Sequence, residues 1–347
     1  MTHDTGGGPA AIPESHQVRF HRRWPALRDP HVRALAWLLY APDLMAADAP
    51  CWEGRIATLG AISPEVAGWL HDLQEDPVLH AALQAHLAHN PSARLGRYAE
   101  KLLGFYLQQQ GWLVAANLQV RNNQGVTRET LGEFDFLVHP PESADDTSLV
   151  HWEFATKFYL LEPRSADDAN DADAFVGPNL ADSLGRKMRK IMQQQLQLSH
   201  HPAAAAVLPA PVTWAGALVK GWLFYRQGMQ MALPASMGIA GDHCRGFWCD
   251  AQGLREQHQP EDRYLILPRL AWLAPAREPV GRGLALDELL GKLEPGFLVD
   301  ESPVMVARCR IEPGVEAELI ETDRGFIVPP GWEQRAASSV RHAVIGV

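Results

Sequence analysis

Two stretches decide the fold: LGEFDFLV, residues 131–138, and LVHWEFATKFYL, residues 149–160. In both, apolar and polar side chains alternate, which is typical of neighbouring β-strands with two distinct faces. The faces of the first strand are Phe134, Phe136 and Val138 against Glu133, Asp135 and Leu137. On the second strand Glu153 and Lys157 share one face, and the other is apolar: Val150, Trp152, Phe154, Phe158 and Leu160. Isolated charges among apolar neighbours are costly, so we expect these charges to be paired or to form a site.

Helix and strand patterns flank this pair of strands. Residues 92–111, SARLGRYAEKLLGFYLQQQG, have an apolar stripe at helical spacing with Glu100 beside it, and the strand-like WLVAANLQV follows. Further on, residues 177–199, GPNLADSLGRKMRKIMQQQLQLS, are predicted to form a second long helix that begins in a turn at GPN. The strand-like AGALVKGWLFYR, residues 215–226, completes the unit. We therefore predict an α/β fold with a mixed central sheet flanked by helices.

The rest of the chain is divided by composition and pattern. Residues 1–18 are rich in Gly, Pro and polar side chains, and we expect them to be disordered. Residues 19–90 repeat apolar side chains every three or four positions, which predicts a helical N-terminal module. The core then spans residues 91–228. Residues 229–347 are predicted to be a strand-rich C-terminal extension.

Composition and charge narrow the classes of function. The chain has 347 residues, of which 46% are hydrophobic and 21% charged, as expected for a globular protein. A net charge of -10 argues against a protein that coats nucleic acid non-specifically. A local basic strip nevertheless lies in the second long helix, where we expect Arg186, Lys187, Lys190 and Gln194 to contact a nucleic-acid backbone. The plain alternative is that this strip is only solvated.

No apolar run is long enough to cross a membrane, and the first residues do not have the pattern of a secretion signal. We therefore expect a cytoplasmic protein that makes no membrane contact. The four cysteines are scattered, and we expect them to be free thiols. No feature of the sequence predicts an oligomeric state.

The charged residues of the core have the types that phosphodiester hydrolysis uses. Asp135 and Glu153 on facing strands, with Glu100 on the preceding helix, offer hard oxygen ligands that suit Mg²⁺ or Mn²⁺. Such an ion lowers the pKa of a bound water, and a nearby ammonium such as Lys157 can stabilise developing negative charge. The competing interpretation is an ordinary solvated acidic face with Lys157 in a cross-strand ion pair.

The order of these motifs resembles a known superfamily. GRYAEKLLGFYLQQQGWLVAANLQVR, then GEFDF, then WEFATKF, is similar to the PD-(D/E)XK nucleases, and within them to Holliday-junction-resolvase-like bacterial proteins. The longer pattern through GPNL, GWLFY, HCRGFW and RGFIVPPGW resembles the bacterial family called domain of unknown function 1853. The resemblance implies a restriction-endonuclease-like core and metal-dependent hydrolysis of nucleic acid, with DNA as the expected substrate.

Carried over by residue, the resemblance implies that Asp135 and Glu153 are metal ligands and that Glu100 is a helix-borne ligand or orients water. It also implies that Lys157 is the catalytic lysine. The chain departs from the family pattern because Ala155 stands two residues after the glutamate, where the lysine is expected. Lys157 lies one pleat further along the same face, about 6.6 Å away, and would have to reach back.

Two other classes of function remain open. In the first, the fold is kept without its chemistry, and the chain is a catalytically inactive nuclease-fold module that binds nucleic acid or a protein partner. In the second, the C-terminal extension binds a partner and the core serves as its scaffold. Metal-dependent cleavage separates the enzyme from both alternatives, whereas metal binding alone does not.

Overall fold

The protein, described by a computed structural model over residues 14–122, 129–139, 149–162, 171–229, 233–312 and 317–345, is built on one mixed sheet. Its strands run in the order β1-β2-β3-β5-β6-β10-β9-β7, with β4 paired to β3 and β8 paired to β10. The strands are β1 Leu113–Asn122, β2 Glu129–Val138, β3 Leu149–Leu161, β4 Phe175–Val176, β5 Val212–Arg226, β6 Cys244–Cys249, β7 Arg263–Ile266, β8 Arg277–Pro279, β9 Val304–Glu312 and β10 Glu318–Ile327. The predicted mixed α/β class is confirmed.

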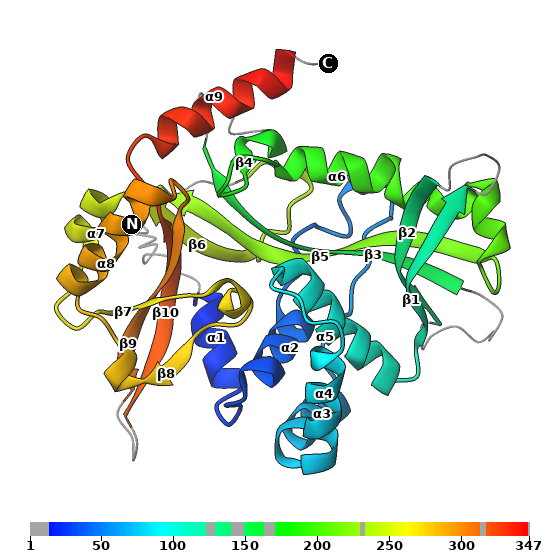
Figure 1. Ribbon diagram of the computed structural model, residues 1–347, viewed down its shortest axis with the longest axis horizontal. Helices are drawn as coiled ribbons and strands as arrows, with labels where there is room; N and C mark the ends of the chain where they lie inside the picture. Colours follow the sequence, from blue (N-terminus) through cyan, green and yellow to red (C-terminus); the bar gives the residue numbers. More distant parts are fainter. Residues whose placement is uncertain are drawn as a thin grey trace, which may run out of the picture.

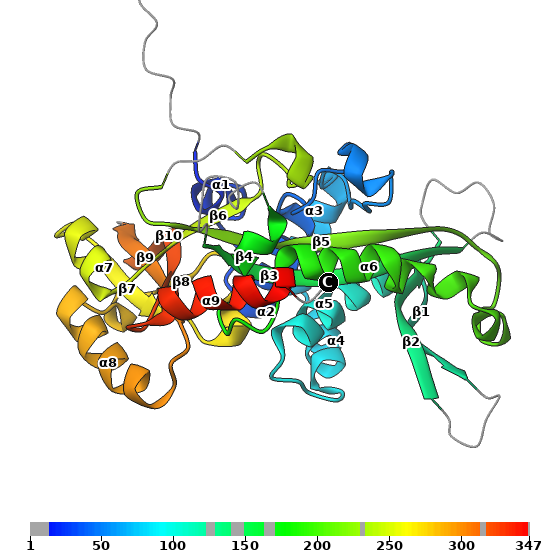
Figure 2. The ribbon, with the colours of Figure 1, turned by 90° about the horizontal axis from the view of Figure 1, so that it is seen from above.

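Helices cover both faces of this sheet. The α-helices are α1 His16–Arg23, α2 Pro30–Tyr40, α3 Pro64–Glu75, α4 Pro77–Ala88, α5 Leu95–Gln109, α6 Leu184–Gln193, α7 Ala251–Gln257, α8 Leu286–Val299 and α9 Trp332–Ile345. In Figure 1, α6 and α9 lie above the long strands β3 and β5, whereas α1, α2 and α5 lie below them. The view from above shows α6 running along β3 and β5 (Figure 2). None of the helices in the described ranges is long and apolar enough to span a membrane.

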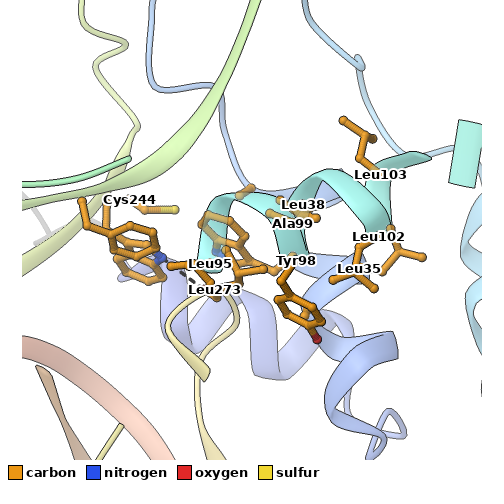
Figure 3. Packing of buried hydrophobic residues seen from close by; sticks show 14 of the residues in the cluster. Leu35, Leu38, Leu95, Tyr98, Ala99, Leu102, Leu103, Cys244 and Leu273 are labelled. Atoms are coloured by element: carbon orange, nitrogen blue, oxygen red, sulfur yellow. Dashed lines mark hydrogen bonds between the residues drawn. The ribbon is translucent and has the colours of Figure 1, made fainter. Parts of the chain in front are cut away.

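The predicted core unit is present in the predicted order. α5 leads into β1, β2 and β3, which pair antiparallel, and α6 then connects β3 to the parallel strand β5. A long connection with a helix is what a parallel pair requires, because its strands run in the same direction. α5 packs its apolar stripe against α2 below the sheet, where Leu102 and Tyr98 meet Leu35 and neighbouring side chains (Figure 3).

The strand-rich C-terminal part continues the same sheet. β5 pairs parallel with β6, and β6 pairs parallel with β10, so the sheet passes from the core into the C-terminal strands without a break. The largest apolar cluster also joins the two parts, because Trp222 of β5 and Phe326 of β10 belong to it. The strand content predicted for residues 229–347 is confirmed, and this part shares its core with residues 91–228.

The helical N-terminal module is confirmed, with differences at its ends. α1 begins at His16, inside the stretch expected to be disordered, because Ser15 caps the helix and Phe20 is fully buried; residues 1–13 lie outside the described residues. Residues 41–63 leave the helical pattern where Ala41 precedes Pro42, a position that disfavours helix. This segment runs beside the sheet instead, with a bridge from Ile56 to Ala217 of β5.

The second long helix is shorter than its sequence pattern predicts. Gly177 to Asn179 form part of a turn, as expected, but α6 starts only at Leu184, where the side chain of Ser183 accepts a hydrogen bond from the backbone N–H of Arg186. After Gln193 the chain tightens into a 3₁₀ segment, Gln195–His200. The change from α to 3₁₀ geometry turns the side chain of Gln195 toward the sheet, which matters for the site.

Candidate functional site

The site lies where β2 and β3 stop pairing. The two strands pair over Phe136–Val138 and Val150–Trp152, and Asp135 and Glu153 directly follow the last pair. The carboxylate of Asp135 accepts a hydrogen bond of 2.9 Å from the backbone N–H of Phe154. Separated strands leave room between their side chains, so this end of the ladder presents two acids side by side.

Strict alternation fails at this point of β2. Phe136 belongs to the large apolar cluster, but Phe134 packs with Leu137 in another cluster and meets the ring of His151 at 4.8 Å between centroids. The prediction that Phe134 shares a face with Phe136 is therefore wrong. On the neighbouring strand β1, a left-handed residue, Asn117 with φ of 55°, stands between the partners of Phe134 and Phe136, so the backbone beside this part of β2 is not regular.

Burial dominates the electrostatics of the acid pair. Glu153 is 2% exposed, and burial followed by the charge of Asp135 raises the pKa of its carboxyl far above the usual range. Burial also raises the pKa of Asp135, while the Phe154 backbone hydrogen bond lowers it. In the part of the chain that the structure describes, Glu153 Oε2 has no hydrogen-bond partner, and it lies 3.8 Å from Nε2 of the buried His151. The pair therefore lacks a full complement of positive charge.

α6 and the 3₁₀ segment after it supply the polar groups that face the pair. The ammonium of Lys187 donates a hydrogen bond of 2.9 Å to Gln195 Oε1, and the Gln195 amide in turn donates to Glu153 Oε1. The charge of Lys187 lowers the pKa of both acids. The pKa of Lys187 is itself lowered, by burial first, although the charge of Glu153 acts in the opposite direction.

Glu100 approaches the pair from α5. Its carboxylate lies 2.8 Å from Arg97 Nη1, and burial followed by the charge of Asp135 raises its pKa. Arg97 also donates to the side chain of Asn117 and lies 3.4 Å from Glu133 Oε1. The structure thus brings Glu100 to the same edge as Asp135 and Glu153, with Glu133 at the rim.

Lys157 is directed elsewhere. Its ammonium lies 3.5 Å from Asp182 Oδ2, and the same carboxylate oxygen accepts a hydrogen bond of 2.9 Å from the hydroxyl of Tyr159. Asp182 lies in the turn before α6. Lys157 therefore makes its ion pair with this turn, and its side chain does not take the reach back toward Glu153 that the sequence predicted.

The basic strip of α6 separates into three groups. Arg186, Lys190 and Gln194 are exposed, which suits contacts to a polyanion. Arg189 pairs with Asp173 at 2.7 Å. Lys187 is half-buried and faces the acids, so its expected contact with nucleic acid would have to take place within the site.

Sequence reasoning missed the groups that complete this arrangement. His151 was visible as a neighbour of Glu153, because alternation places both on one face of β3. Gln195 had no local signal, since its direction depends on the 3₁₀ turn after α6. The inward direction of Lys187 is set by how α6 lies on the sheet.

Metal-ligating side chains are sparse. Within the described ranges, no group of three or more His, Cys, Asp or Glu side chains is arranged to hold a metal ion. All four cysteines are free, as predicted, with Cys51 exposed and the others buried. Any metal here would be held by the two carboxylates of the pair with the help of water or substrate.

Comparison with known proteins places the chain in a family. No curated protein and no solved structure matches it. A family model described as Domain of unknown function (DUF1853) matches residues 33–328, from within α2 to the residue after β10. This range includes the acid pair, α6 and the C-terminal strands β6 to β10. The chain therefore belongs to the DUF1853 family.

Proposed function

We propose that this protein is a metal-dependent nuclease that hydrolyses phosphodiester bonds of nucleic acid, with DNA as the expected substrate. One observation carries the proposal: the buried Glu153 and the half-buried Asp135 lie side by side where β2 and β3 separate, with Glu100 at the same edge. Buried acids with raised pKa values that share a site are typical of functional centres.

The order of the helices and strands along the chain also supports a nuclease. α5, the antiparallel strands β1 to β3, α6 and the parallel strand β5 follow one another as in the PD-(D/E)XK nucleases that the sequence resembles. Asp135 and Glu153 lie on the second and third strands of this unit, which are the strands that carry the acids in the resemblance. Fold alone does not establish function, so the proposal depends on the site.

The residues present fit a divalent cation. Glu153 is buried and Asp135 is half-buried, and within the described residues Glu153 Oε2 has no hydrogen-bond partner. Burial raises the pKa of both acids, as expected for a pair without a full positive counter-charge. Mg²⁺ is commonly held by one or two protein carboxylates, with water and substrate phosphate completing its octahedron. Asp135 and Glu153 would hold it, and Glu100 would orient water beside them.

A bound Mg²⁺ or Mn²⁺ would supply a water of lowered pKa and offset charge on the phosphate. The side chains of the protein would bind the nucleic acid and orient it at the site. Arg186 and Lys190 on the exposed side of α6 would contact backbone phosphates, and an ammonium at the site would stabilise the charge that develops on the phosphate oxygens. In hydrolysis a bond forms between the water oxygen and phosphorus, the bond from phosphorus to the leaving sugar oxygen breaks, and that oxygen takes up a proton.

A second candidate is a nuclease-fold module without catalysis that binds nucleic acid or a protein partner. One observation favours it: the Glu153 carboxylate is almost fully covered and already accepts a hydrogen bond from Gln195. In this candidate the acids remain protonated or paired, and α6 serves for binding alone.

The test is cleavage of labelled single-stranded, duplex and branched DNA, and of matching RNA, with Mg²⁺ or Mn²⁺. We expect metal-dependent cutting that falls about 1,000-fold in Asp135→Asn and in Glu153→Gln, because each removes a charged oxygen ligand. Asp48→Asn, which changes an exposed acid, is the matched control and should cut normally. Binding without cutting on every substrate, by a folded protein, contradicts the proposal and supports the binding module.

A further inference from the structure

The geometry points to Lys187 of α6, in place of Lys157 of β3, as the lysine that contacts the scissile phosphate. This inference rests on the proposed nuclease function. Ala155 occupies the strand position where the resemblance expects a lysine, so the required cation has to come from another position in the chain.

Lys187 is connected to the acid pair through one side chain. Its ammonium donates to Gln195 Oε1 at 2.9 Å, and the Gln195 amide donates to Glu153. The stem of Lys187 is half-buried against the sheet, and its helix neighbours Leu184 and Ile191 are buried beneath it. A lysine held in this way keeps few rotamers, and its charge stays within reach of the pair.

Lys157 is committed to another role. The Lys157 ammonium lies 3.5 Å from Asp182 Oδ2, which also accepts a hydrogen bond from the hydroxyl of Tyr159. Lys157 therefore helps to fix the turn that leads into α6. The charge of Lys157 also lowers the pKa of Lys187, so the two ammonium groups lie near each other, and Lys187 is the one that Gln195 links to Glu153. Lys157 therefore acts on the site through the position of α6.

Placing the catalytic cation on α6 changes how the substrate is held. Arg186 and Lys190 project from the exposed side of this helix, so backbone binding and charge stabilisation come from one rigid element. As negative charge develops on the phosphate in the transition state, the Lys187 ammonium exchanges Gln195 Oε1 for a phosphate oxygen. Lys187 stays protonated throughout and transfers no proton, and the leaving sugar oxygen takes its proton from solvent.

The test compares Lys187→Met with Lys157→Met in the full chain. Methionine keeps the length of the buried stem and removes the charge. We expect Lys187→Met to lower kcat about 100-fold with little change in KM, and Lys187→Arg to restore part of the loss. We expect Lys157→Met to lower kcat by a smaller factor than Lys187→Met does. Lys292→Met, on the exposed side of α8, is the matched control for loss of a lysine.

A second measurement separates chemistry from folding and binding. In Ca²⁺, under conditions without turnover, Lys187→Met should bind the DNA substrate within about 3-fold of the unaltered protein and melt at a similar temperature. An equal or larger loss of kcat in Lys157→Met, or full activity in Lys187→Met while Asp135→Asn is inactive, overturns the inference alone. Absence of metal-dependent cutting by the unaltered protein overturns the proposed function, and the inference with it.

Discussion

A charged side chain in this protein behaves according to how deeply it is buried and what lies beside it. Glu162, just after β3, illustrates this away from the site. It is 7% exposed, and burial followed by the charge of Glu333 raises its pKa to about 7, against the smaller opposing effect of Arg226. Arg226 Nη1 lies 2.6 Å from Glu333 Oε1, so the charge of Arg226 is already paired with Glu333. Among the described residues, no ion pair is formed by the buried Glu162.

Glu162→Gln should remove a pH dependence of stability. The folded pKa lies above the unfolded one, so the folded state binds more protons between about pH 4.5 and 7. The free energy of unfolding of the unaltered protein then falls as pH rises through this window. We expect Glu162→Gln to be more stable by about 2 kcal/mol at pH 8 and nearly unchanged at pH 4.

Urea unfolding at both pH values measures this difference. Glu294→Gln, exposed on α8, is the control and should stay within about 0.5 kcal/mol of the unaltered protein at each pH. An equal effect of Glu162→Gln at pH 4 and pH 8 would mean that this carboxyl does not titrate between them.

At the scale of elements, the register between β3 and β5 positions the site. These strands pair in parallel from Leu149 with Val212 to Leu160 with Phe224, and Lys157 lies opposite Gly221. A side-chain carbon at Gly221 would collide with the backbone carbonyl of Lys157, which cannot move without breaking the ladder. Gly221 is therefore required by close approach of two backbones rather than by a turn.

Gly221→Ala should destabilise the fold by about 3 kcal/mol or more, because the added methyl group meets backbone and not a flexible side chain. Gly96→Ala on α5 is the matched control. A methyl group there would meet no atom of the described residues within 4 Å, and alanine favours helix, so this variant should gain about 0.5–1 kcal/mol in free energy of unfolding. Thermal unfolding of the two variants checks both signs, and a neutral Gly221→Ala would show that β5 can shift its register.

The strands β3 and β2 show where alternation in the sequence predicts the two faces of a strand correctly and where it does not. The apolar and polar faces of β3 were predicted correctly, because a strand buried on both sides keeps regular geometry: Phe154 and Phe158 lie in one cluster, Ala155 and Tyr159 in the other. In β2 the prediction failed at Phe134, beside the left-handed residue of β1. Alternation describes a regular strand, and irregularities arise from the partner strand, which the local sequence does not contain.

For the whole molecule, one sheet makes the chain a single unit. Arg324 of β10 is fully buried, and its Nε lies 2.6 Å from Glu321 Oε1. Its guanidinium lies over the ring of Trp222 of β5. Its guanidinium also donates to the backbone carbonyls of Trp272 and Ala274. A charge so completely desolvated depends on all of these groups at once, so the C-terminal strands and the core stabilise each other.

We therefore expect the full chain to unfold in one transition, with fluorescence and circular dichroism changing together. Residues 91–228 produced alone should aggregate or lack fixed tertiary structure, because the edge of β5 that pairs with β6 would be left open. Near-ultraviolet circular dichroism and size-exclusion chromatography test the fragment against the full chain. A monomeric fragment that unfolds cooperatively would show that the core is an independent domain.

The sequence by itself determined the class of fold, the order of the core elements and the residues at the end of the β2–β3 ladder. These follow from local periodicity and from the cost of isolated charges in apolar strands, both of which can be read within a few residues. Tertiary structure alone decided that Lys157 turns to Asp182, that Lys187 and Gln195 face Glu153, and that the C-terminal strands join the same sheet. The direction of a long side chain and the partner of an edge strand depend on elements far away in the chain, whose placement no local pattern specifies.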